Sequence, residues 1–125
     1  MRELSKEMIL KLHRETIIKH GGLDGVRDEK LLLSSIYSPY QTFGGEDLYP
    51  TIIDKSARMS YLIVKNHPFV DGNKRTAFLV LSTMLVLNNI TLFAGKKDIV
   101  RIFQKLASGE ITYSYFLVWV KAHTE

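Results

Sequence analysis

The sequence predicts an all-α domain: a compact bundle of about six helices around one buried central helix, with a short flap near residues 40–49. Three observations predict this fold class. Apolar residues recur at helical spacing along nearly the whole chain. The length of 125 residues, of which 46% are hydrophobic, suits one domain with one core. Residues 76–87 are so rich in apolar side chains that they are expected at the centre.

The first three helices are predicted from their apolar faces and their end signals. Ser5 is a typical helix N-cap, and Gly21 with Gly22 is a stop signal, so these residues bracket the first helix. Pro39 ends the second helix, and Pro50 stands near the first position of the third. The expected ranges are 5–20, 28–37 and 50–65.

Residues 39–50, between the second and third helices, lack helical periodicity. Gly44 and Gly45 predict a tight turn there between two short extended arms, and these arms are the expected flap. Three apolar side chains of the flap suit either the core or contact with a partner: Phe43, Leu48 and Tyr49.

The fourth helix is predicted over residues 73–88. Nine of the twelve residues from 76 to 87 are apolar and cover all sides, which is typical of a buried helix. Two more helices are expected over 97–106 and 113–122, the second with Thr112 as its N-cap. No repeat or linker divides the chain, so residues 1–125 are predicted to form a single domain. Aromatic residues of the last helix are expected to face the core: Tyr113, Tyr115, Phe116 and Trp119.

The composition excludes several classes of protein. The chain has no cysteine, which rules out disulfides, cysteine nucleophiles and thiolate metal sites and favours a reducing compartment. The N-terminus is too charged for a signal peptide, and the longest apolar stretch, residues 77–87, is too short to span a membrane. A cytoplasmic protein is therefore expected. The 17 basic and 13 acidic residues give a net charge of +4, which suits an anionic partner.

Residues 67–77 combine a histidine, an acid, an amide and two cations in front of the most apolar helix. Lys74 and Arg75 fall in the first helical turn, where cations are unfavourable unless an anion binds there. Gly72 lets a ligand approach the backbone closely. This combination predicts a site for a phosphate chain, and Asp71 beside it is a candidate magnesium ligand.

His67 is the candidate general base beside this site. A neutral imidazole accepts a hydroxyl proton at physiological pH, and no other histidine lies nearby in the sequence. Phe69 is expected to anchor the loop on the core. Each of these residues taken alone has an ordinary structural explanation, so the prediction rests on their combination. The other histidines lack the spacing of metal ligands and are expected on the surface: His13, His20 and His123.

The run from His67 to Arg75 resembles the signature loop of the Fic/Doc superfamily, whose members transfer part of a nucleotide to a protein hydroxyl. Other positions resemble its death-on-curing (Doc) branch, and the likeness covers nearly the whole chain: Gly21-Gly22-Leu23, Val26-Arg27-Asp28, Pro39, Phe43 and Asn88-Asn89. The resemblance implies a Fic-fold bundle with His67 as the base on the target hydroxyl and Asp71 as the Mg²⁺ ligand. It also implies that ATP phosphates are held by Gly72, Asn73, Lys74 and Arg75.

Two positions separate the branches of this superfamily. Fic enzymes that transfer AMP have glycine where this chain has Lys74 and a second arginine where it has Phe78. The Doc branch has lysine, so the resemblance implies a protein kinase that transfers the γ-phosphate of ATP. Pro68 and Gly72 are Fic-like, which keeps an AMP transferase as the alternative. A second alternative is a non-catalytic, basic helical protein that binds nucleic acid.

The resemblance also implies partners. The Doc-type substrate is a threonine of elongation factor Tu, whose modification arrests translation. The implied inhibitor is an antitoxin of the Phd type, acting in trans, and contact with nucleic acid would be indirect, through that antitoxin. No Ser/Thr-x-x-x-Glu-Gly/Asn string occurs in the chain to inhibit it in cis. Residues 40–49 would be the flap that pairs with an extended segment of the target.

Overall fold

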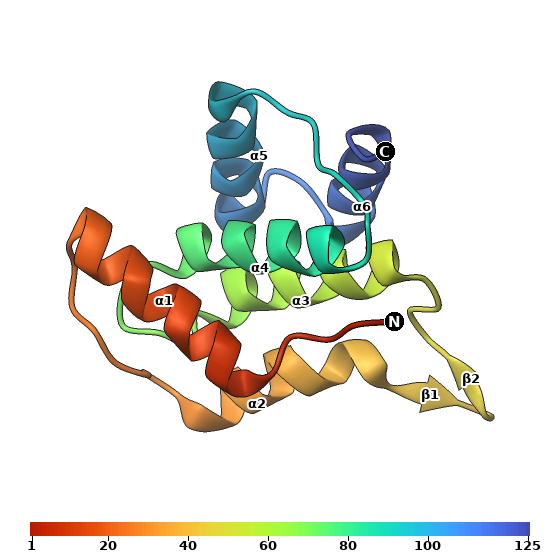
Figure 1. Cartoon of the computed structure of the whole chain (residues 1–125), viewed down its shortest axis with the longest axis horizontal. Coiled ribbons are helices and arrows are strands. Elements are labelled where there is room, and N and C mark those ends of the chain that lie inside the picture. The colour runs from red at the N-terminus through yellow and green to blue at the C-terminus, as the bar shows by residue number, and fades with distance from the viewer.

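The structure, a computed structural model, describes residues 1–125. It contains six α-helices, one short 3₁₀ turn (η1) and a small antiparallel hairpin (Figure 1). The all-α prediction is confirmed, and every helix end lies within two residues of its predicted position. The elements in chain order are α1 (Lys6–His20), α2 (Glu29–Tyr37), η1 (Ser38–Tyr40), β1 (Thr42–Phe43), β2 (Glu46–Asp47), α3 (Ile52–Asn66), α4 (Asn73–Leu87), α5 (Lys96–Ser108) and α6 (Tyr113–Ala122).

Four of the six helices begin at a side chain that accepts a hydrogen bond from the first turn. These N-caps are Ser5, Asp28, Thr51 and Thr112. The two exceptions are α4 and α5, which begin at Gly72 and Gly95 without a side-chain cap. The first N–H groups of α4 therefore have no partner from a capping side chain.

Helices α3 and α4 lie side by side at the centre of the bundle (Figure 1). Helix α1 packs against α4, while α2, α5 and α6 pack against α3. The predicted central helix, α4, has a fully buried face that includes Val80, Leu81 and Met84. It is not buried on all sides, because Val86 is 62% exposed. The apolar composition of α4 therefore identified its central place, but α3 shares that place with it.

The predicted flap is present as a hairpin in which Thr42 pairs with Asp47 and Phe43 with Glu46. The intervening Gly44 and Gly45 have φ values of 59° and 83°, which L side chains rarely adopt. Phe43 is 80% exposed, so it belongs to the surface rather than the core.

Two cations of α3 hold the base of this hairpin. The Lys55 side chain is buried and donates to Oδ2 of Asp47 at 3.1 Å and to the carbonyl of Tyr49. The Arg58 guanidinium lies 5.2 Å from the centre of the Tyr49 ring and 4.8 Å from that of Tyr113, a cation–π arrangement. The hairpin is therefore attached to the N-terminal half of α3.

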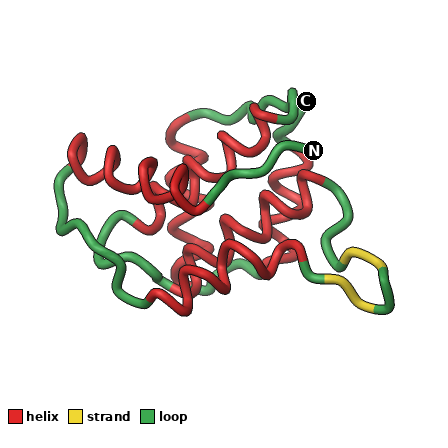
Figure 2. Tube along the Cα trace, turned by 60° about the horizontal axis from the view of Figure 1, so that its bottom comes forward, coloured by secondary structure: helices red, strands yellow, loops and turns green.

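The hairpin projects from one end of the bundle in both views (Figures 1 and 2). It leads into the first turn of α3, whereas the loop of residues 67–72 follows the last turn. A helix of 15 residues spans about 22 Å. The hairpin and His67 consequently stand at opposite ends of α3.

Helix α6 differs from the prediction at one aromatic residue. Phe116 is buried in the core as predicted, but Tyr115 is exposed, so the expected aromatic stripe is wrong at this position. Successive residues of a helix point in directions about 100° apart, and adjacent aromatic residues cannot share one narrow face.

No helix of the structure combines the length and apolar character needed to cross a membrane.

The first turn of α3 contains a carboxylate with a shifted pKa. Partial burial alone would raise the pKa of Asp54. The hydrogen bonds from Thr51 and the nearby Lys121 ammonium outweigh this effect and hold the pKa below its ordinary value of 3.8. Asp54 and Thr51 form a capping box, and Lys121 of α6 lies 3.4 Å from Oδ1 of Asp54.

This shift predicts how the stability of the protein depends on pH. Because the folded pKa lies below the unfolded one, the stabilisation by Asp54 is present above about pH 4 and is lost as the pH falls further. The unfolding temperature should therefore fall more steeply with acid in the parent than in Asp54→Asn between about pH 4.5 and pH 2.5. Thermal melts of both proteins across this range test the prediction, and parallel curves would contradict it.

Candidate active site

His67 stands where α3 ends and the loop to α4 begins. Its backbone is left-handed, with φ at 52° and ψ at 53°, a conformation that costs a non-glycine residue about 1 kcal/mol or more. Arg27 supports it by donating from Nε to the His67 carbonyl at 2.7 Å and from Nη2 to the Asn66 carbonyl at 2.8 Å. The imidazole is exposed, so it is accessible to a substrate.

The buried amide of Asn73 determines how this imidazole is held. Its Oδ1 accepts the Phe69 N–H at 3.0 Å, which fixes the orientation of the amide, because an N–H only donates. Its Nδ2 donates to the Phe69 carbonyl at 3.0 Å and lies 2.7 Å from Nδ1 of His67. Nδ1 therefore accepts, and the neutral ring carries its proton on Nε2. With its side chain fully used, Asn73 has only its backbone N–H to offer an anion.

The start of α4 presents a set of unpartnered donors. The backbone N–H groups of residues 71–75 make no hydrogen bond within the protein. Gly72, in the N-cap position, has a φ of 78°, and no acidic residue lies in the first turn. Lys74 and Arg75 are exposed beside these donors. Free N–H groups, the helix dipole and two cations together are the features that favour the binding of an anion.

The pKa of His20 is affected by the positive charge at the start of α4. Desolvation lowers the pKa of His20 below its ordinary value of 6.5, and the charges of Arg75, Lys19 and Lys96 lower it further. These cations come from three different elements: the end of α1, the start of α4 and the start of α5. The positive potential at this end of the bundle is therefore built by the tertiary fold.

Asp71 is held from two sides. Its Oδ2 accepts the Leu23 N–H at 2.7 Å, and its backbone carbonyl lies 2.7 Å from Nε2 of His13. Oδ1 has no protein partner, so it is free to coordinate a cation. No group of three or more acidic or histidine side chains gathers anywhere in the structure as a ready metal site. A single carboxylate fits Mg²⁺, which takes one or two carboxylates together with phosphate oxygens and water.

A short extended segment lies along the loop on its outer side. The Arg27 N–H donates to the Pro68 carbonyl at 2.7 Å, and the Val70 N–H donates to the Gly25 carbonyl at 3.0 Å. Val26 is thereby bridged to Phe69, with its own N–H and C=O directed away from the loop and unpartnered. The side chains of Val26 and Val70 are both exposed. An open strand edge with apolar neighbours thus lies next to His67.

Comparison with known proteins identifies the family. The model of the Fic/DOC family matches residues 3–85, which include α1 to α3, the loop that follows α3, and α4 except for its last two residues. The chain belongs to the Fic/DOC family. It is 42% identical over 77 residues to "Toxin Doc" of Mycolicibacterium smegmatis, a match that covers 62% of this chain and 59% of that protein. It is 28% identical over 114 residues to "Protein kinase doc" of Escherichia phage P1, covering 91% of this chain and 89% of that protein.

The structure brings together the residues that the Fic/DOC resemblance had indicated. His67 and Asp71 lie in one loop, and Gly72 to Arg75 form the start of α4 directly after it. Phe69 is fully buried, as predicted for the anchor of this loop. The roles of these residues in binding and catalysis remain predictions.

His13 is the residue that the sequence prediction placed wrongly. It was expected on the surface, but it is 2% exposed and stacks on Phe69 with ring centres 3.8 Å apart. His20 is exposed as predicted, and His123 is partly buried. A signal was available, because His13 falls four residues from Ile9 and four from Ile17, on the buried face of α1.

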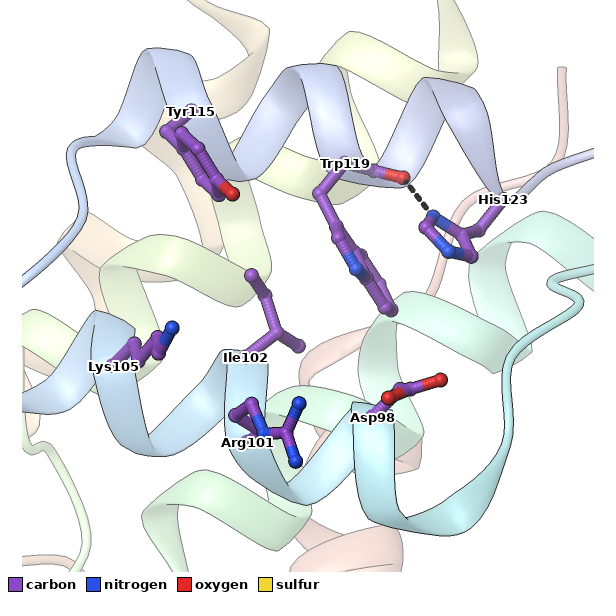
Figure 3. Close-up of a pocket in the computed structure, with 7 residues that line it drawn as sticks. All are labelled: Asp98, Arg101, Ile102, Lys105, Tyr115, Trp119 and His123. Atoms are coloured by element: carbon purple, nitrogen blue, oxygen red, sulfur yellow. Dashed lines mark hydrogen bonds between the residues drawn. The ribbon is translucent and has the colours of Figure 1, made fainter.

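A separate surface pocket of about 300 Å³ lies between α5 and α6 (Figure 3). Arg101 of α5 and Trp119 of α6 face each other across it, and exposed Tyr115 forms part of its wall (Figure 3). It contains none of the predicted site residues and lies outside the part of the chain that the Fic/DOC family model matches. The remaining lining residues are Asp98, Ile102, Lys105 and His123.

Removal of the Asn73 amide should destabilise the loop of residues 67–72. Asn73→Ala leaves the buried N–H and C=O of Phe69 without partners, which is expected to lower the free energy of unfolding by about 2 kcal/mol. Urea unfolding measures this loss, and hydrogen exchange at the Phe69 amide should accelerate. Gln104→Ala, which removes an exposed amide from α5, is the control and should change neither quantity. Equal stability of both variants would contradict the role given to Asn73.

Proposed function

We propose that this protein is a Doc-type toxin that transfers the γ-phosphoryl group of ATP to a serine or threonine hydroxyl of a cellular protein. The observation that carries the proposal is the anion site at the start of α4, next to the accessible imidazole of His67. The name of the phage P1 relative, "Protein kinase doc", supports the same chemistry. By resemblance, the target is elongation factor Tu, and an antitoxin of the Phd type restrains the toxin.

The phosphate chain is assigned to the unpartnered donors at the start of α4. The backbone N–H groups of Gly72 and Asn73 and the side chains of Lys74 and Arg75 would hold its oxygens. Magnesium at Asp71 would neutralise phosphate charge when it is bound. Lys74 places a cation where AMP-transferring relatives have an open glycine.

Phe78 adds an argument against AMP transfer. Its ring is partly buried and packs edge-on against Phe103 of the apolar core, with ring centres 6.2 Å apart. AMP-transferring relatives have at this position the second arginine, which binds the outer phosphate. An aromatic side chain packed in this way supplies no charge to a phosphate, so kinase chemistry is favoured.

The proposed step is a phosphoryl transfer in line with the bond that breaks. The target oxygen forms a bond to the γ-phosphorus, the bond from that phosphorus to the bridging oxygen breaks, and ADP leaves. The hydroxyl proton passes to His67. Because the resting ring bears its proton on Nε2, it must first release Asn73, either by turning Nδ1 outward or by moving its proton to Nδ1. The bond to Asn73 therefore defines a resting state of the base.

The target chain is assigned to the open strand edge at Val26. An extended segment that pairs with the free N–H and C=O of Val26 would lie one strand spacing, about 4.8 Å, beyond Val26. It would therefore lie two spacings, about 10 Å, from Phe69 in the loop that carries His67. The hairpin of residues 42–47, predicted to pair with the target, precedes the N-terminus of α3, whereas His67 follows the C-terminus of this helix, which is about 22 Å long. Its contact with the target stays a prediction, and the Val26 edge is the better placed of the two.

Transfer of label from ATP tests this proposal. The protein is incubated with a bacterial lysate and ATP labelled on the γ- or the α-phosphate. Label on a protein is expected from the γ-position and not from the α-position. His67→Ala should reduce transfer by about 10²- to 10⁴-fold, because the proton acceptor is lost while the phosphate donors stay. His123→Ala, which removes a histidine outside the site, is the control. Transfer of the α-label by the parent would establish AMP transfer instead.

Lys74→Gly probes what sets the orientation of the nucleotide. The variant loses a phosphate ligand, so γ-transfer should fall by about tenfold or more. It also opens space at the helix N-terminus, so a weak transfer of the α-label is expected to appear. The same labelled nucleotides measure both effects. An unchanged rate of γ-transfer would show that Lys74 does not contact the phosphates.

A further inference from the structure

The buried histidine of α1 has a place in this site that the proposed function does not assign. We propose that His13 is a positioning residue, which holds the Asp71 carbonyl so that the Gly72 N–H faces the bound phosphate. The proposal rests on the proposed function only for the identity of the anion. The geometry from which it is argued belongs to the protein alone.

The His13 ring is held in one tautomer and one orientation. Nε2 lies 2.7 Å from the Asp71 carbonyl oxygen, and a carbonyl only accepts, so Nε2 carries a proton. The ring lies flat on Phe69, with an angle of 8° between the two planes. On its other side, Nδ1 is 3.6 Å from Oδ1 of Asp24. The ring is thus fixed in position and in the direction of its donor.

The planar peptide bond between Asp71 and Gly72 links the carbonyl held by His13 to the Gly72 N–H. In a trans peptide the C=O and the following N–H point in opposite directions. Because His13 draws the Asp71 carbonyl inward toward α1, the Gly72 N–H is turned away from α1. That N–H has no partner in the protein and is the first of the donors assigned to phosphate. One hydrogen bond from a buried ring therefore orients a donor on the opposite side of the backbone.

Gly72 packs closely against α1. A Cβ atom built on Gly72 would lie 3.3 Å from Cδ1 of Ile17 and 3.7 Å from Cδ2 of His13. With so little space, the peptide cannot move toward α1. The imidazole N–H then prevents the remaining motion, which is rotation of the carbonyl away from it. His13 thus acts on the binding site through the backbone, at a distance from any ligand.

Two substitutions separate the hydrogen bond from the packing. His13→Phe keeps a flat ring on Phe69 but removes the donor, whereas His13→Gln loses the ring but places an amide N–H near the Asp71 carbonyl. His123→Phe is the matched control. His123 also stacks on an aromatic ring, that of Trp119, and its Nδ1 lies 2.7 Å from a backbone carbonyl, but it is outside the site.

Affinity for a non-hydrolysable ATP analogue with Mg²⁺ is measured by calorimetry. It should fall about tenfold in His13→Phe, the effect of one lost hydrogen bond, and less than about threefold in His13→Gln and His123→Phe. The NMR signal of the Gly72 amide, read without nucleotide, should move in His13→Phe and stay near its parental position in His13→Gln. A merely structural role would lower the unfolding temperature of both His13 variants without this split.

The proposal is overturned if His13→Phe binds the analogue as the parent does or leaves the Gly72 amide unmoved. Should His13→Phe not fold, imidazole ¹⁵N shifts in the parent decide, since a proton on Nδ1 alone excludes the proposed bond. Failure of the parent to bind any nucleotide would contradict the proposed function instead. The Gly72 amide would still report on His13 in that case, so the two failures are distinguishable.

Discussion

The missing side-chain cap at the start of α4 is the constraint on which the rest of the site depends. Four helices of this protein use a serine, threonine or aspartate to satisfy their first N–H groups, but α4 begins at a glycine and has two cations in its first turn. Such a terminus is unfavourable by itself, because positive side chains oppose the helix dipole. An anion that accepts from the free donors relieves both costs. The local sequence thus gives up helix stability at the place where we propose that phosphate binds.

The fold offsets this cost through supports that reach the loop from elsewhere in the chain. Arg27 holds the left-handed backbone at His67, His13 holds the Asp71 carbonyl, and Leu23 donates to the Asp71 carboxylate. All three come from α1 or the segment that follows it, about 40 to 60 residues earlier in the sequence. The first thirty residues are therefore as much a part of the candidate site as the loop that carries the chemistry.

The helices, the hairpin and the members of the candidate site could be predicted from the sequence, because each depends on residues that are close together in the chain. Helix ranges follow from apolar periodicity and from N-cap residues such as Ser5 and Thr112. The hairpin turn follows from the Gly44-Gly45 pair. Each of these signals acts over a few residues only. The run from His67 to Arg75 is one contiguous segment, so its members were certain to lie together. Phe69 was predicted to anchor this loop on the core, and its full burial confirms that prediction.

What could not be predicted depends on contacts between segments. The spacing of His13 from Ile9 and Ile17 indicated the buried face of α1, but its partners, Phe69 and Asp71, approach it only in the folded chain. The hairpin was identified correctly, but its distance from His67 follows from the direction and length of α3, which a pattern of residue types does not reveal. The exposure of Tyr115 likewise depends on how α6 is turned against α3 and α5. Periodicity identifies the apolar face of a helix but not the neighbour that covers it.

The most direct test of the account is a crystal structure of the protein with Mg²⁺ and a non-hydrolysable ATP analogue. The account predicts phosphate oxygens on the N–H groups of residues 72 and 73, with Lys74 in contact, the metal at Asp71 and the γ-phosphorus nearest to His67. An α-phosphorus nearest to His67 would contradict kinase chemistry and favour AMP transfer. A nucleotide bound elsewhere, with the start of α4 left free, would contradict the central claim that this uncapped helix is the phosphate site.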